Sequence, residues 1–84
     1  MTDPPPDVRD ALRQLLAEAA AAARERDAGT ADDILDTVAR VAENKLPESD
    51  LRGRLLFGVE RARGLAADEP LVAAEYCRAM RDLL

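Results

Sequence analysis

The sequence of 84 residues contains no histidine, no tryptophan and only one cysteine, Cys77. A single cysteine cannot form a disulfide within the chain, and without histidine the usual ligand sets for zinc are incomplete. The lack of histidine also removes the base that a nucleophilic cysteine normally needs. We therefore expect Cys77 to be a small buried hydrophobic residue. We predict no enzyme activity, no metal site and no cofactor.

Aromatic residues are limited to Phe57 and Tyr76, so little surface is present on which nucleic-acid bases could stack. The formal net charge is −5, and an acidic chain repels a phosphate backbone. This charge resides in the first half: residues 1–44 hold ten acids and five arginines, whereas residues 45–84 hold seven acids and seven bases. We therefore expect a protein as partner rather than a nucleic acid.

Long apolar runs are also absent. No stretch of about 18 apolar residues occurs, and the first residues lack the basic region and apolar core of a signal peptide. Together with the unpaired cysteine, which suits a reducing compartment, this predicts a cytoplasmic protein without membrane contact. The excess of arginine over lysine, with many alanines and aspartates, indicates a bacterial or phage genome.

Abundant Ala, Leu, Arg and Glu favour helix throughout the chain. Apolar residues at helical spacing predict four helices, over about residues 7–27, 31–46, 48–67 and 69–84. Because the links between them are short, consecutive helices should pack antiparallel. The predicted fold is an all-α, up-and-down bundle of four helices. Residues 1–6, which contain three consecutive prolines, are expected to be an extended lead-in to a single domain of residues 7–84.

Glycines and prolines predict where these helices begin and end. Gly29 should terminate the first helix, with Thr30 as the N-cap of the second. Pro47 and Pro70 should lie in the first turns of the third and fourth helices. In the fourth helix, one broad apolar arc is expected to be buried: Val72, Ala73, Tyr76, Cys77, Met80, Leu83 and Leu84.

The run from Asp32 to Asp36 matches the DDxxD motif with which isoprenoid synthases hold magnesium and diphosphate, through Asp32, Asp33 and Asp36. Carboxylates three or four residues apart on a helix can share a hard cation. Those enzymes, however, are much larger helical folds with a second metal-binding segment, which this chain lacks. Acids near a helix N-terminus are also favoured by the helix dipole alone. We therefore assign no metal site to this run.

Four arginines in the third helix allow an alternative hypothesis, in which the second and third helices form a helix-turn-helix of a DNA-associated regulator. On a helical wheel, however, these arginines divide between the two edges of the apolar arc, and Glu60 interrupts any basic face. This distribution is typical of solvated rims whose aliphatic stems cover the core. The residues are Arg52, Arg54, Arg61 and Arg63.

The third helix has apolar residues on two sides, and Phe57 lies roughly opposite the arc that contains Leu55 and Val59. Phe57 is either buried at the centre of the bundle or part of a surface that binds a second copy or another protein. Our leading hypothesis is a small non-enzymatic interaction module, either a homodimer or an adaptor. A weaker one is a helical subunit of a multi-protein enzyme. The predicted interface residues are Gly53, Leu56, Phe57, Glu60, Gly64 and Tyr76.

Overall fold

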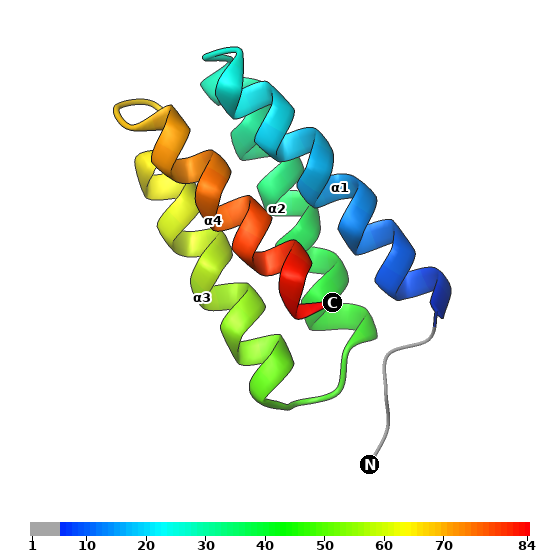
Figure 1. Cartoon of the computed structure of the whole chain (residues 1–84). Coiled ribbons are helices and arrows are strands. Elements are labelled where there is room, and N and C mark those ends of the chain that lie inside the picture. Colours follow the sequence, from blue (N-terminus) through cyan, green and yellow to red (C-terminus); the bar gives the residue numbers. More distant parts are fainter. Residues whose placement is uncertain (1–5) are drawn as a thin grey trace.

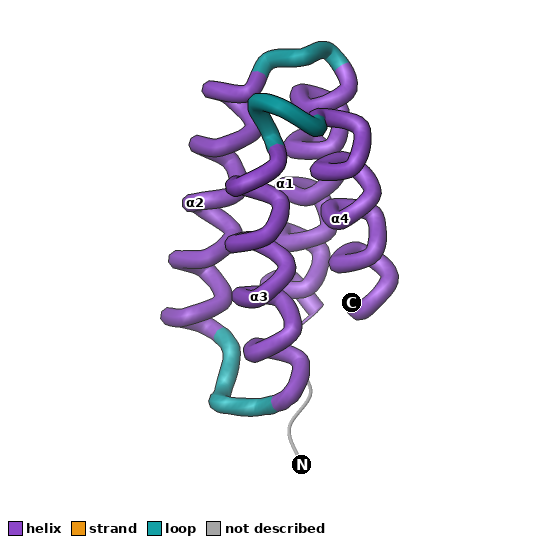
Figure 2. Tube along the Cα trace, turned by 90° about the vertical axis from the view of Figure 1, so that its left-hand side faces the viewer, coloured by secondary structure: helices purple, strands orange, loops and turns teal. Residues whose placement is uncertain are grey.

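The computed structural model describes residues 6–84, which form four α-helices and contain no strand (Figure 1). The helices are α1 (Pro6–Arg24), α2 (Ala28–Lys45), α3 (Asp50–Leu65) and α4 (Pro70–Leu83). Each helix packs antiparallel against the next, and α4 also packs against α1, so that every helix has two neighbours (Figure 2). The predicted all-α, up-and-down bundle of four helices is confirmed. The lead-in predicted for residues 1–6 lies outside the described residues, except for Pro6, the first residue of α1.

The core consists of apolar side chains that point inward from all four helices. Leucines and valines come from α1, α2 and α3, whereas α4 contributes Cys77 and Met80. Alanines dominate the second half of α1, where small side chains allow neighbouring helices to approach closely. No polar or charged residue between positions 6 and 84 is buried. The bulkiest side chains with less than 2% exposure are Leu12, Leu16, Leu35, Leu55, Val38 and Cys77.

The turn between α1 and α2 differs from the prediction. Arg26, and not Gly29, adopts the left-handed backbone conformation, with a φ of 61°. The N–H groups of Arg26 and Asp27 donate back to carbonyls of the last turn of α1, as in a Schellman motif. Asp27 then caps α2 by accepting a hydrogen bond from the N–H of Thr30 at 3.2 Å. The N-cap predicted at Thr30 is wrong because Asp27, three residues earlier, performs that role.

The start of α3 also differs from the prediction. Its N-cap is Ser49, whose Oγ accepts a hydrogen bond from the N–H of Arg52 and donates one to the carbonyl of Pro47. Pro47 therefore lies in the loop, and α3 begins at Asp50. Pro70, by contrast, is the first residue of α4 as predicted. All helix ends lie within three residues of the predicted positions.

Two contacts determine how α3 is rotated in the bundle. A Cβ atom on Gly58 would lie 2.7 Å from Sδ and 2.8 Å from Cγ of Met80, so α4 approaches α3 closely at this glycine. On the opposite flank of α3, Nε of Arg63 donates to Oδ1 of Asp32 in α2 at 2.8 Å. The Gly58 flank of α3 therefore faces α4, and the Arg63 flank faces α2. The residues between these flanks, away from the core, point out of the bundle.

Candidate interaction surface on α3 and α4

Among residues 6–84, large apolar side chains are exposed only in α3 and α4. Between residues 6 and 84 the exposed ones are Phe57 in α3 and Leu71, Val72 and Leu83 in α4, with none in α1 or α2. Phe57 is 63% exposed. The hypothesis that Phe57 is buried at the centre of a lone bundle is therefore wrong, because α2 and α4 pack beside α3 without covering this side chain. Exposed apolar groups that gather on one part of a protein mark interaction sites.

Four residues of α3 form a line along its outer side, which we call the α3 stripe. They are spaced by four, three and four residues and are all exposed: Gly53, Phe57, Glu60 and Gly64. No atom of residues 6–84 lies within 4 Å of a Cβ atom placed on Gly53 or Gly64, so neither glycine is required for packing within that part of the chain. Each glycine costs a helix about 1 kcal/mol relative to alanine. Gly53 also lines a shallow hollow with Ser49, Asp50, Arg54 and Phe57.

Four residues of α4, which we call the α4 stripe, repeat these spacings: Val72, Tyr76, Ala79 and Leu83. Val72 and Leu83 are 42% and 38% exposed, Ala79 is exposed and Tyr76 is half-buried. The sequence placed three of the four in the buried arc of this helix. That arc was drawn too wide, because α1 and α3 cover only the side of α4 that carries Cys77.

Both stripes lie on the same side of the bundle. Gly58 faces α4. Successive residues of a helix are about 100° apart, so Phe57 is turned by that angle from Gly58, on the side away from the core, and points outward on the flank of α3 that meets α4. Tyr76 lies beyond Met80, on the flank of α4 that meets α3. The helices α3 and α4 run side by side (Figure 1). The α4 stripe, together with Phe57 and the two glycines of the α3 stripe, therefore forms one surface, which we call the α3–α4 face. Glu60 lies at the other edge of the α3 stripe, where it lines a depression with Ala39 and Glu43 of α2. Leu71 lies on the other flank of α4.

The structure brings four of the six predicted interface residues onto the α3–α4 face: Gly53, Phe57, Gly64 and Tyr76. Leu56 and Glu60 lie apart from them, on the α2 flank of α3. There Leu56 is half-buried, Glu60 is exposed, and both line a depression with Ala39 and Glu43. Three residues of the face were missed: Val72, Ala79 and Leu83. Their spacing, which equals that of the α3 stripe, was the signal in the sequence that could have identified them.

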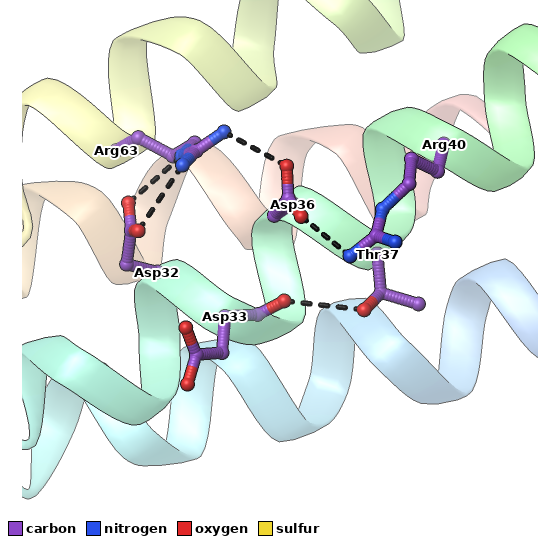
Figure 3. A network of polar contacts seen from close by, with 6 residues as sticks. All are labelled: Asp32, Asp33, Asp36, Thr37, Arg40 and Arg63. Atoms are coloured by element: carbon purple, nitrogen blue, oxygen red, sulfur yellow. Dashed lines mark hydrogen bonds and ion pairs between the residues drawn. The ribbon is translucent and has the colours of Figure 1, made fainter.

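A separate polar cluster joins α2 to α3 (Figure 3). Arg63 donates from Nε and Nη2 to the two carboxylate oxygens of Asp32 at 2.8 and 3.1 Å, and from Nη1 to Asp36 at 3.3 Å. Arg40 donates to the other oxygen of Asp36 at 2.6 Å. Two of the three DDxxD carboxylates, Asp32 and Asp36, are thus bridged by the Arg63 guanidinium, and the third, Asp33, is exposed. No group of three or more Cys, Asp or Glu residues in the described part of the chain could hold a metal ion.

This cluster stabilises the packing of α2 against α3. The hydrogen bonds from Arg63 lower the pKa of Asp32 below its ordinary value, and those bonds raise the pKa of Arg63. The Arg63 and Asp32 side chains are 38% and 43% exposed, so solvent screens their attraction. Such pairs contribute up to about 1 kcal/mol. Among the four arginines of α3, Arg63 is therefore engaged within the chain.

Cys77 is buried as expected, with 1% of its surface exposed. Burial raises the pKa of the Cys77 thiol to about 11, against a weaker opposing effect of the nearby Arg24. The group is therefore a neutral thiol at physiological pH. A neutral buried thiol is a poor nucleophile and acts as a small apolar side chain.

Together the fold and this surface define a small antiparallel four-helix bundle with one apolar outer face, formed by α3 and α4. No helix between residues 6 and 84 has the length and apolar character needed to cross a membrane. The chain belongs to the family described as a domain of unknown function, DUF8101, whose model matches residues 1–84. No match was found among curated proteins or among solved structures.

Proposed function

We propose that this chain is a small non-enzymatic module for protein–protein interaction, and that the α3–α4 face is its contact surface. The observation that carries the proposal is Phe57, 63% exposed in the middle of α3, with an open glycine on either side in the same stripe. Interface energies are dominated by a few aromatic and large aliphatic anchors that become buried on binding. Phe57 and Leu83 are the side chains of this face that fit that role.

Gly53 and Gly64 support the proposal independently of the apolar residues. Each lowers the helix stability of α3 by about 1 kcal/mol, and no neighbour among the described residues uses the space that they leave. Glycine inside a helix commonly has a packing reason, namely the close approach of another chain segment. Since residues 6–84 leave this space unfilled, the two glycines support contact with a segment of another chain.

The helix-turn-helix alternative has less support. Arg63 is held by Asp32 and Asp36, and Glu60 lies exposed beside Arg61 on the outer side of α3. The helices α2 and α3 also lie side by side along the bundle (Figure 2). A DNA-reading helix instead presents clustered positive charge to the groove and crosses its partner helix at a large angle.

The proposal can be tested by site-specific photo-crosslinking in extracts of the source organism. A photoreactive phenylalanine analogue replaces Phe57 in one variant and Gln14, an exposed residue on the outer side of α1, in the control variant. We expect crosslinks to protein, identified by mass spectrometry, from position 57 and not from position 14. Absence of crosslinks at position 57, or equal yields at both positions, would overturn the proposal.

A further inference from the structure

We propose that the α3–α4 face binds a second copy of the same chain, through a two-fold axis that runs parallel to the helices. This inference rests on the proposed function and adds the identity of the partner and the register of contact. Such an axis places α3 of one copy against α4 of the other, and α4 against α3. Because α3 and α4 are antiparallel within the chain, the two contacts between the copies are antiparallel as well.

Size complementarity between the two stripes favours this arrangement. Their spacings of four, three and four residues are identical, so the stripes align residue for residue when they run antiparallel. In that alignment each exposed apolar side chain meets a small residue. The three pairs are Gly53 with Leu83, Phe57 with Ala79, and Gly64 with Val72. Glu60, which lines the depression against α2, lies outside this contact.

The register of α3 and α4 within one chain agrees with this alignment. A two-fold axis parallel to the helices leaves every residue at its own height, so both copies keep the heights seen in the single chain. The contact of Gly58 with Met80 sets these heights. Because α3 and α4 are antiparallel, one residue before Gly58 is level with one residue after Met80, so Phe57 is level with Arg81. Ala79 is two residues from Arg81, which is about 3 Å along the helix axis. The paired residues are thus already at nearly equal heights.

The distribution of charge favours the same orientation. Residues 45–84, which contain α3 and α4, carry equal numbers of acids and bases, whereas residues 1–44 carry a net charge of −5. Two copies can therefore meet through their α3–α4 halves, each of which has a formal net charge of zero over residues 45–84. The acidic halves of the two copies then lie on the outside, where their repulsion is screened by solvent.

The face is also large enough for a specific dimer. The bundle measures 38 × 19 × 19 Å between its outermost Cα atoms. A standard protein interface buries about 800 Å² on each partner, which is close to the area of one long side of this bundle. The α3–α4 face is the long side on which Phe57, Val72 and Leu83 are exposed.

The inference is tested by sedimentation equilibrium of the purified full chain from micromolar to millimolar concentration. We expect a dimer whose dissociation constant rises at least about 30-fold on Phe57→Ala, as for a hot-spot residue. Gly64→Ala should weaken the dimer at least about tenfold, because the added methyl group fills the space for Val72 of the second copy. Gly29→Ala is the matched control: its added Cβ also meets nothing within 4 Å, but Gly29 lies in α2. This change should leave the dissociation constant as it is.

A size exchange tests the register itself. Ala79→Phe alone should weaken the dimer at least about tenfold, because two phenylalanines then compete for the space of one. The double variant Phe57→Ala with Ala79→Phe should return to within about threefold of the unmodified chain, because the coupling of contacting residues restores the pair. Both positions are exposed in the single chain, so each variant should fold. Circular dichroism confirms the helix content of every variant.

Two outcomes would overturn the inference: a monomer at all concentrations, or a dimer that is indifferent to Phe57, Gly64 and the size exchange. If the purified chain is a monomer while position 57 crosslinks to a different protein, the second copy is excluded and the interaction module stands. If position 57 gives no crosslink and the chain is a monomer, both proposals fail.

Discussion

Alanine substitutions at three glycines of α3 should have opposite effects on stability. Gly53→Ala and Gly64→Ala should each stabilise the monomer by about 1 kcal/mol, because alanine favours helix and the new methyl group meets nothing. Gly58→Ala should gain the same helix stability, about 1 kcal/mol. Its methyl group, however, would lie 2.7 Å from Sδ of Met80, and overpacking of this kind costs about 1–3 kcal/mol. The net expectation for Gly58→Ala is a loss of about 1 kcal/mol.

These changes are measurable by urea and thermal unfolding. In a domain of this size, 1 kcal/mol shifts the melting temperature by about 4–8 °C. The slope of the free energy against urea should stay unchanged, since none of the substitutions alters the surface exposed on unfolding. The measurements belong at low micromolar concentration, where association with a second copy makes the smallest contribution to apparent stability.

Repeating Gly58→Ala in a chain that also carries Met80→Ala separates the steric overlap with Met80 from the other effects of the substitution. Met80→Ala removes both Cγ and Sδ, so in that background Gly58→Ala should stabilise by about 1 kcal/mol, as at Gly53. If Gly58→Ala stabilises the unmodified chain as much as Gly53→Ala does, the contact of Met80 with Gly58 carries no packing cost. The reasoning that predicts a loss from overpacking would then be refuted.

Three further predictions concern the rest of the chain. Arg26→Gly should stabilise by about 1 kcal/mol in urea unfolding, because Arg26 has a φ of 61° that glycine adopts without strain; a loss of stability would contradict this backbone assignment. Asp32→Asn should cost up to about 1 kcal/mol near neutral pH. The pKa of Asp32 is lowered in the folded chain. The stability contributed by Asp32 is therefore present above its unfolded pKa of about 3.9 and is lost as the pH falls through its folded pKa. Urea unfolding at low pH should then show no difference between the unmodified chain and Asp32→Asn. The Arg63→Ala variant should abolish this dependence on Asp32. Finally, the Cys77 thiol should react with a thiol reagent at pH 8 only after unfolding, because its pKa is raised to about 11 and it is buried; rapid reaction of the folded chain would contradict its burial.

The four helices and their order could be predicted from the sequence because the apolar residues recur at helical spacing throughout. The helix ends were less predictable, since several residues compete to cap each one. Asp27 and Thr30 are both good N-caps by type, and only the Schellman turn at Arg26 decides between them. The same applies to Pro47 and Ser49, where the serine hydroxyl completes the cap.

The candidate surface was predictable on α3 and not on α4. On α3, Phe57 stands opposite the core arc, so its unusual position shows in the sequence alone. On α4, Tyr76 and Leu83 adjoin the core arc, and only the packing of α3 and α1 determines where burial ends. The bridge from Arg63 to Asp32 was missed for a similar reason: it joins residues 31 positions apart, whose contact depends on how α2 and α3 align.

The most direct test of the central claim, that the α3–α4 face binds a second copy, is an isotope-filtered nuclear Overhauser measurement on a mixture of ¹³C-labelled and unlabelled chains at millimolar concentration. Only contacts between copies give signals in this experiment. The two-fold arrangement predicts signals from the Phe57 ring to the Ala79 methyl group and from the Leu83 methyl groups to the Gly53 Hα atoms. Absence of all intermolecular signals, or signals that arise from α1 and α2 instead, would contradict it.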